Sequence, residues 1–233
     1  MLRAGSVLLA SWFAAAPARA IDLPALLEGV RQNARATTPV RADVVFTRGE
    51  TRTPGVLLAW RDVVYLETAS GFRALVRPGK TVVVANGHPV HAPLRTPVPG
   101  TDFLVEELPF AGVPLAFPQI HDEGPEGVVL AGAPAVTSLY VLVVRTIDVD
   151  RNVVTMTKYY KDDIATLFKL RRDSAFVQLD GHWRPGALEA QDFTDNSTTR
   201  ATLAWKAAGE LPRALFTPKG LRAPSGLTIP AAG

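Results

Sequence analysis

The feature that most limits the fold is a change in the spacing of apolar residues at Val40. Residues 23–34 place apolar side chains three or four positions apart, which is the spacing of one helical face. From Val40 onward apolar and polar residues alternate, which is typical of half-buried strands. The chain is therefore expected to open with one helix and to continue as a mainly β structure.

Turn residues divide the alternating region into a series of short expected strands. They cover residues 40–48, 54–60, 62–68, 71–77, 80–86, 126–131, 138–149, 152–161, 164–172, 174–180, 187–193 and 198–206. Asn86-Gly87 is a hairpin turn signal, and Asp150-Arg151-Asn152 is a second one. Because strands joined by short turns pair antiparallel, the predicted architecture is an antiparallel meander.

The expected strands carry their apolar residues on one side. In the last strand Thr199, Ala201, Leu203 and Trp205 share one face, and Thr198, Arg200, Thr202 and Lys206 share the other. Phe72, Ala74 and Val76 alternate in the same way with Arg73, Leu75 and Arg77, as do Ile164, Thr166, Phe168 and Leu170 with Ala165, Leu167, Lys169 and Arg171. Such a sheet has to cover its apolar face with helices, a second sheet or a bound apolar molecule.

The opening helix has a start signal and a single apolar stripe. Asp22 is a suitable N-cap and Pro24 lies in the first turn. The stripe consists of Leu23, Leu26, Leu27, Val30 and Ala34. This pattern predicts a surface helix that packs through one face.

Residues 92–125 interrupt the strand pattern with a run of prolines. Within them, residues 102–108 form a short amphipathic stretch, which Asp102 is expected to cap as a helix with Leu104 and Leu108 on one face. A loop of this length inside a compact domain is usually functional. We therefore interpret this segment as a lid.

The first twenty residues have the pattern of a secretory signal peptide. Arg3 precedes the apolar run 7–16, and Ala18-Arg19-Ala20 is the small-x-small pattern of a cleavage site. Cleavage after Ala20 removes two of the charges in a net +3. The remaining Lys and Arg are scattered among acids, which argues against nucleic acid as a partner. We expect export, one domain over 21–221 and a loose tail over 222–233.

Motifs for catalysis or for metal binding are missing. The chain has no Cys, no G-x-S-x-G and no HExxH. Gly79-Lys80-Thr81 lacks the first glycine of a P-loop, because Ala74 stands there, and the run from Asp148 lacks the glycine and glutamate of a calcium loop. The adjacent carboxylates 106–107, 122–123 and 162–163 point in different directions on a regular element. We therefore predict a binding protein without a cofactor or a metal, not an enzyme.

Several local stretches resemble the LolA-like family of outer-membrane lipoprotein-sorting proteins. They are Pro99-Gly100-Thr101-Asp102-Phe103-Leu104-Val105-Glu106-Glu107-Leu108, Lys158-Tyr159-Tyr160-Lys161-Asp162 followed by Lys169, and Trp183-Arg184-Pro185 with Asp192-Phe193. The resemblance covers residues 22–221. It implies a mainly β fold with some α structure, an incomplete and strongly curved antiparallel β-barrel whose open side is covered by helices.

The resemblance also implies a function. Members of the family hold acyl chains in an apolar cavity and carry lipidated cargo through the periplasm, from an inner-membrane transporter of the ABC or RND type to an outer-membrane acceptor. An arginine on a strand latches the lid in the founding carrier, and Arg61 and Arg77 are both candidates here. The alternative is a periplasmic sensor or regulatory module of the RseB type. Such relatives carry a further C-terminal domain, for which the residues beyond Leu221 leave no room.

The strand faces and the lid stretch together suggest a binding site for lipid. The expected cavity wall consists of Phe72, Val76, Phe168, Leu170, Leu203 and Trp205. The expected lid residues are Phe103, Leu104 and Leu108. The alternative for each of these residues is ordinary core packing.

Overall fold

The fold is described by a computed structural model that covers residues 21–77, 79–110 and 114–231. The predicted signal peptide over 1–20 lies outside these residues. The described chain is mainly β and contains one α-helix together with three short 3-10 helices. The expected class, a helix followed by an antiparallel meander, is confirmed.

The elements are bounded as follows. They are α1 (Leu23–Ala34), β1 (Ala36–Arg48), β2 (Thr51–Arg61), β3 (Val63–Thr68), β4 (Arg73–Arg77), β5 (Lys80–Ala85), β6 (His88–Ala92), η1 (Val105–Glu107), β7 (Leu115–Gly124), β8 (Gly127–Pro134), β9 (Leu142–Asp148), β10 (Val153–Tyr160), β11 (Leu167–Ser174), β12 (Val177–Leu179), β13 (His182–Arg184), β14 (Ala187–Asp192), β15 (Ser197–Ala207), η2 (Arg213–Phe216) and η3 (Gly220–Arg222).

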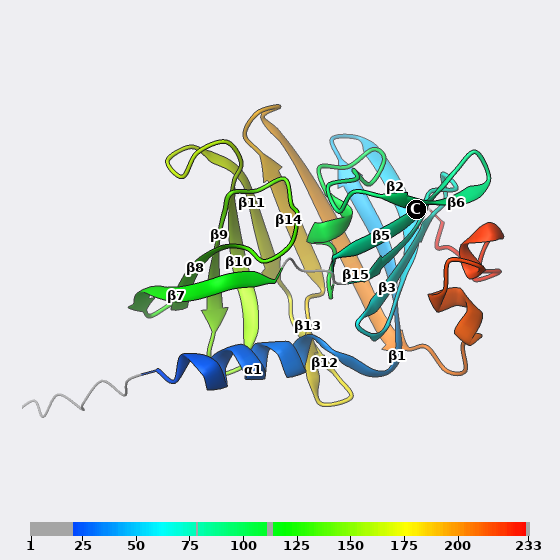
Figure 1. Ribbon diagram of the computed structural model, residues 1–233. Helices are drawn as coiled ribbons and strands as arrows, with labels where there is room; N and C mark the ends of the chain where they lie inside the picture. Colours follow the sequence, from blue (N-terminus) through cyan, green and yellow to red (C-terminus); the bar gives the residue numbers. More distant parts are fainter. Residues whose placement is uncertain (1–20, 78, 111–113, 232–233) are drawn as a thin grey trace, which may run out of the picture.

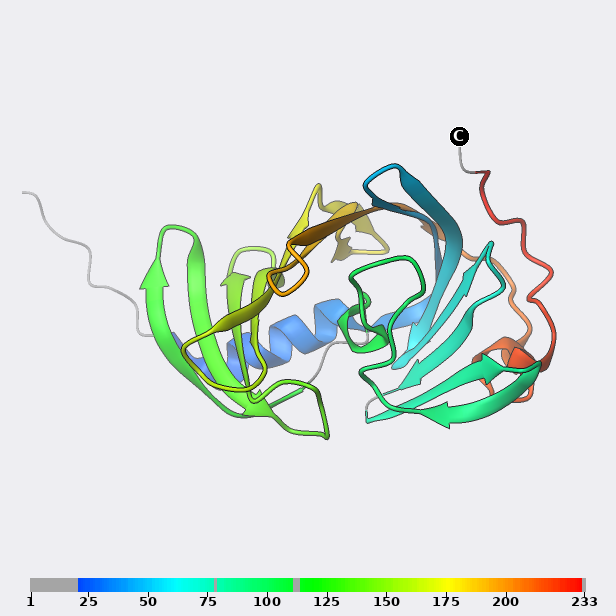
Figure 2. The same cartoon turned by 90° about the horizontal axis from the view of Figure 1, so that it is seen from above.

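One large antiparallel sheet holds most of these strands. Its order is β6-β5-β4-β3-β2-β1-β15-β14-β11-β10-β9-β8-β7, and β12 and β13 form a separate hairpin. The two ends of the sheet, β6 and β7, are not paired with each other, so the sheet is bent but not closed (Figure 1). Figure 2 shows it as an open arc with α1 and η1 on the inner side.

The two edge strands of the sheet, β6 and β7, each contain a proline. Proline cannot donate to a sheet ladder, so it is tolerated at edges, where Pro89 of β6 and Pro118 of β7 lie. Strands β6, β7 and β13 were not predicted, and β7 lies within the expected loop 92–125. The turn at Asn86-Gly87 is confirmed, since both residues have positive φ between β5 and β6.

The helix α1 begins where the sequence predicts. The Asp22 carboxylate accepts a hydrogen bond from the Ala25 amide at 3.1 Å, which satisfies one of the free N–H groups of the first turn. Leu26 is buried against Val128 and Leu130 of β8 and Ile147 of β9. The predicted apolar stripe therefore packs on the inner face of the β8–β9 end of the sheet.

At the opposite end of the sheet, strands β2–β5 are buried on both faces. On their outer face the C-terminal segment packs Leu215, Phe216 and Leu221 against a cluster of sheet residues, namely Val56, Leu58, Val63, Tyr65, Leu75 and Val82. The sequence analysis expected this face to be wet. It is covered instead, because the turns after β15 fold back onto it.

The expected loose tail over 222–233 is attached to the sheet over part of its length. The Ser225 amide donates to the Glu67 carboxylate at 3.0 Å, and Arg41 donates to the Thr228 carbonyl at 2.5 Å. Leu227 and Ile229 pack against the outer cluster. These contacts correct the prediction for residues 225–229.

A plug segment held on the inner face

The inner face of β1–β5 is filled by residues 93–110, which we call the plug segment. Its backbone is hydrogen-bonded within itself: the amides of Val98, Val105 and Glu106 donate to the carbonyls of Phe103, Thr96 and Leu94 at 2.8, 2.9 and 3.2 Å. Compact surface loops that bond internally in this way are Ω-loops. The backbone–backbone hydrogen bonds described for this segment all join two of its own residues, so side chains attach it to the sheet.

Apolar side chains of the plug segment interdigitate with those of the sheet. The buried plug residues are Leu94, Val98, Phe103, Val105 and Leu108. The Phe103 ring lies against Phe46 of β1, with 5.6 Å between ring centroids. Four of the predicted wall residues, Phe72, Val76, Leu203 and Trp205, belong to this same cluster. The sequence predicted a hollow at this place, whereas the structure fills it with the predicted lid.

Asp102 fixes the plug segment to β15 and β1. Its carboxylate accepts hydrogen bonds from the hydroxyls of Ser197 and Thr199 at 2.7 and 2.8 Å, and its own amide donates to the Thr199 hydroxyl at 2.8 Å. Arg48 forms an ion pair with the same carboxylate at 3.1 Å. Asp102 therefore binds the sheet and does not cap a helix as predicted.

Glu107 fixes the other side of the plug segment to β11. Its carboxylate lies 3.2 Å from the Lys169 ammonium and accepts a hydrogen bond from the Tyr140 hydroxyl. Lys169 also donates to the Asp102 carbonyl at 2.7 Å, and Arg171 donates to the Glu107 carbonyl. Both partners of the ion pair are buried. Removing one partner of such a pair strongly destabilises the folded protein, because the other charge stays buried without compensation.

The neighbouring carboxylate, Glu106, is buried with fewer partners. The Ser138 hydroxyl donates to its Oε2 at 2.9 Å, while Oε1 has no hydrogen-bond partner among the described residues. Burial raises the pKa of Glu106 to about 7, and the charge of Glu107 adds to this effect against the Ser138 hydrogen bond. Burial likewise raises the pKa of the Tyr140 hydroxyl, with Glu107 adding to it.

The predicted helix over 102–108 is only one 3-10 turn, Val105–Glu107. Leu104 and Leu108 flank it in extended conformations, and Pro109 disfavours a helical Leu108. They therefore do not share a face. Leu108 packs in the cluster over β1–β5, whereas Leu104 contacts the cluster of Tyr140, Val143 and Tyr159.

A bulge in β11 reverses part of the predicted strand face. Lys169 pairs with Tyr159 and Leu167 with Tyr160, so Phe168 is the extra residue. Phe168 consequently lies on the inner side with Tyr140, at 6.2 Å between ring centroids. Because Lys169 and Arg171 reach the plug segment, Leu170 between them points to the outer face. This corrects its placement in the cavity wall.

Neither arginine proposed as a latch contacts the plug segment in the described structure. Arg61 lies over the Trp60 ring at 4.9 Å, and Arg77 donates to the Phe216 carbonyl at 2.8 Å. The cations that bind the plug segment through hydrogen bonds or ion pairs are Arg48, Lys169 and Arg171, and Arg184 lies over the Phe110 ring at 4.7 Å. Of these, the sequence analysis singled out Lys169 within the family resemblance, but strand alternation assigned it to the wrong face.

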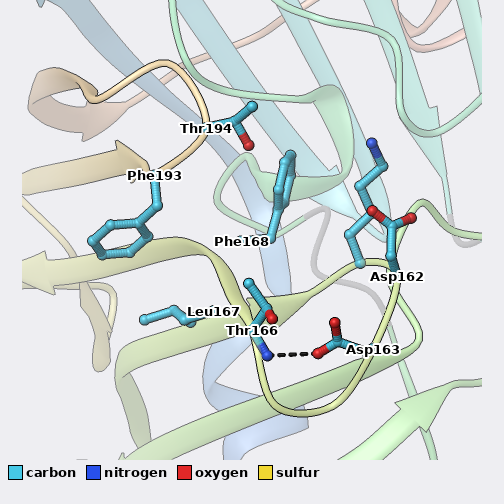
Figure 3. Close-up of a pocket in the computed structure, with 8 residues that line it drawn as sticks. Asp162, Asp163, Thr166, Leu167, Phe168, Phe193 and Thr194 are labelled. Atoms are coloured by element: carbon cyan, nitrogen blue, oxygen red, sulfur yellow. Dashed lines mark hydrogen bonds between the residues drawn. The ribbon is translucent and has the colours of Figure 1, made fainter.

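Two open clefts lie in the part of the sheet from β7 to β14. One has a volume of about 300 Å³ and is lined by Lys161, Asp162, Asp163, Thr166, Leu167, Phe168, Phe193 and Thr194 (Figure 3). Figure 3 shows the Phe168 ring between Thr194 and Asp162. The other, of about 280 Å³, lies between β7 and β8. Of the predicted wall and lid residues, these two clefts include Phe168.

In residues 21–77, 79–110 and 114–231, no three His, Asp or Glu side chains are placed to hold a metal ion. Within the same ranges, α1 is too short and too polar to span a bilayer.

Comparisons with known proteins give structural matches. No protein-family model and no curated protein matches the sequence. A domain assigned to outer-membrane lipoprotein sorting from Vibrio parahaemolyticus matches with TM-score 0.69 at 12% identity, over 85% of this chain and 97% of that one. A LolA superfamily protein from Nitrosomonas europaea matches with TM-score 0.67 at 16% identity, over 85% and 98%.

A DUF1329 family protein from Desulfovibrio piger matches with TM-score 0.64 at 14% identity, over 85% of this chain and 98% of that one. At such low identities a structural likeness establishes the architecture and not the activity. The matches cover most of the chain, including its large antiparallel sheet. The chain therefore has the LolA-like fold.

Proposed function

We propose that the chain is a periplasmic carrier that holds the acyl chains of a lipid or a lipidated protein against the inner face of its sheet. The observation that carries this proposal is the plug segment. Its backbone hydrogen bonds are internal, so it is able to leave the sheet as a unit without breaking a strand ladder. Its removal would uncover a continuous apolar surface on β1–β5, β14 and β15.

The energies of the plug segment and of an acyl chain on this surface are comparable. Five buried apolar side chains at about 2 kcal/mol each give roughly 10 kcal/mol in favour of the closed plug. A chain of about 16 carbons at ~0.8 kcal/mol per methylene gives about 12 kcal/mol relative to water. Exchange between plug and lipid is then nearly balanced, so a partner protein is able to set its direction.

The compartment and the partners of this carrier are taken from the predicted signal peptide and from the family resemblance. The signal peptide would deliver the chain to the periplasm, and the resemblance suggests an inner-membrane transporter of the ABC or RND type as donor and an outer-membrane protein as acceptor. The helix α1 would be a second cover on the inner face beside the plug segment. In the open state the wall would consist of Phe72, Val76, Leu203 and Trp205, and the chain would need no catalytic residue.

A reversible lock on the plug segment tests the proposal. The chain has no cysteine, so Asp102→Cys with Thr199→Cys introduces one possible disulfide between positions already in hydrogen-bond contact. We expect the oxidised double variant to bind a fluorescent 16-carbon fatty acid at least tenfold more weakly than the same protein after reduction. The single Asp102→Cys variant is the control, and its binding should not respond to the reductant.

The outcomes separate the possible functions. Equal binding before and after reduction, with the disulfide verified by mass spectrometry, would contradict the movable plug. A direct complement is mass spectrometry of organic extracts from wild-type protein purified from its native periplasm. If no acylated compound were present and a periplasmic protein were recovered instead, the sensor alternative would replace the carrier.

A further inference from the structure

The polar contacts of Lys169 have a consequence for the open state. The side chain of Lys169 is 3% exposed, and its described polar partners are the Asp102 carbonyl and the Glu107 carboxylate. Both belong to the plug segment. When the plug segment leaves, this ammonium loses both partners.

An unpaired cation is costly when a bound acyl chain excludes water from it, so the loaded open state needs another anion at this place. Arg171 also loses a plug partner, the Glu107 carbonyl, but it keeps two hydrogen bonds to Asp173 at 2.6 and 2.5 Å. Asp192, opposite Lys169 on β14, already accepts hydrogen bonds from the backbone amides of Thr194 and Asp195. This acid, which lies opposite Lys169 in the ladder, is therefore engaged in its own turn.

The site borders the apolar surface that an acyl chain would cover. Arg171 pairs with Ala190 across the β11–β14 ladder, and Ala190 is part of the cluster under the plug segment. A ligand with a negative head group at Lys169 would thus have its chain directed over the place where Phe103 and Leu108 now lie. This geometry matches an amphiphile better than a free ion.

We infer that Lys169 and Arg171 form a binding site for the anionic head group of the cargo, a carboxylate or a phosphate, and that the Glu107 carboxylate occupies this site in the closed state. The inference rests on the proposed carrier function and narrows its cargo to anionic amphiphiles. The plug segment and the cargo then compete at two places. The apolar side chains of the plug compete with the acyl chain for the sheet, and the Glu107 carboxylate competes with the anionic head group for Lys169.

The test compares ligands with one chain length and different head groups. Dodecyl phosphate, dodecanoate and 1-dodecanoylglycerol are titrated below their aggregation concentrations, and inorganic phosphate is titrated alone. Because a charge-assisted hydrogen bond contributes about 1.5–3 kcal/mol, we expect the wild type to bind the two anionic ligands at least tenfold more tightly than the neutral one. Inorganic phosphate should neither bind measurably nor displace dodecyl phosphate at equal concentration.

Lys169→Met should abolish the preference for anions, so that this variant binds dodecyl phosphate, dodecanoate and 1-dodecanoylglycerol with affinities that agree within about twofold. Lys158→Met is the matched control, because Lys158 pairs with Leu170 on the outer face of the neighbouring strand. It should retain the preference. If Lys169→Met folds poorly, the double variant Lys169→Met with Glu107→Gln removes both charges of the buried pair and keeps the comparison measurable.

The possible results are distinct. Equal wild-type affinity for charged and neutral ligands would overturn the head-group site while leaving the carrier function intact. Displacement of dodecyl phosphate by inorganic phosphate would also overturn it, in favour of a site for free anions. Binding of none of the three amphiphiles would contradict the carrier function itself.

Discussion

The two ends of the sheet meet the plug segment in different ways. Over β1–β5 the contact is apolar, and the outer face of β2–β5 is covered by the C-terminal segment. Over β9–β11 the inner face carries charged and hydroxyl groups, among them Lys169, Arg171 and Tyr159. The first end resembles an ordinary core with two layers of cover. The second resembles a latch.

The apolar contacts and the ionic contacts therefore have different roles in holding the plug segment closed. Apolar burial gives a large free energy but no dependence on charge or pH. Buried ion pairs add little net stability but are strongly destabilising when one partner is lost, so they suit a contact that has to switch. A plug segment held by both kinds of contact would stay closed until another anion replaces Glu107 at Lys169.

The largest expected effect is in the apolar half. Phe103→Ala should lower the free energy of unfolding by about 4 kcal/mol, because it leaves a cavity in a fully packed cluster. Phe216→Ala removes a ring of the same size from the outer cluster and should cost a similar amount. Chemical denaturation measures both.

Binding separates these two variants. Phe103→Ala weakens the closed plug, so it should bind a fluorescent 16-carbon fatty acid at least tenfold more tightly than the wild type. Phe216→Ala leaves the plug segment intact and should bind as the wild type does. If both variants changed binding equally, the inner and outer covers would be equivalent and the plug segment would have no special role.

The next effect concerns the latch. Glu107→Gln should lower the free energy of unfolding by about 3 kcal/mol, since it leaves the Lys169 ammonium buried without its countercharge. Glu189→Gln is the matched control, because its pairs with Arg172 and Arg200 are at the surface, and it should cost less than about 1 kcal/mol. Equal losses in denaturation experiments would show that the buried pair has no particular weight.

The main features of the fold follow from the sequence, because period and turns are local properties. The helix α1 with its Asp22 cap, the Asn86-Gly87 hairpin and the face shared by Ala74 and Val76 all appear as predicted. The inner cluster contains most of the expected wall. Binary patterning is thus enough to say which residues avoid water, although it does not say whether a ligand or the chain itself covers them.

The site depends on information that the local pattern lacks. The bulge at Phe168 shifts the alternation of β11 by one residue, so Lys169 and not Leu170 faces inward. Asp102 reaches Thr199 across nearly a hundred residues of sequence, a pairing that no spacing rule predicts. The C-terminal cover of β2–β5 likewise depends on tertiary folding, and it turned an expected wet face into a core.

A smaller effect, and one that depends on pH, is expected at Glu106. Glu107 of the same segment, Lys169 of β11 and Tyr140 before β9 are the charged or titratable groups facing it. The folded chain holds the Glu106 proton up to about pH 7, whereas the unfolded chain releases it near the ordinary glutamate pKa of 4.5. Its contribution to stability is therefore complete below that value and is lost as pH rises through 7.

Glu106→Gln removes this titration. At pH 8 the variant should be more stable than the wild type by on the order of 2 kcal/mol, and at pH 5 the two should be nearly equal. Urea denaturation at several pH values measures the difference. A gap that stays constant with pH would mean that Glu106 does not titrate in this range, and the latch would then lack a pH-sensitive component.

The smallest effect is expected at Arg48, the cation of β1 that pairs with the plug segment. Arg48 of β1 pairs with Asp102 at 3.1 Å, but its side chain is 39% exposed, and Asp102 keeps its hydrogen bonds to Ser197 and Thr199 without it. Exposed ion pairs contribute little, so Arg48→Met should lower the free energy of unfolding by less than about 1 kcal/mol and leave the preference for anionic amphiphiles unchanged. A loss as large as that of Glu107→Gln would mean that both ends of the sheet latch the plug segment. The contrast between an apolar contact over β1–β5 and an ionic contact over β9–β11 would then be wrong, because the ion pair of Asp102 would matter as much as that of Glu107.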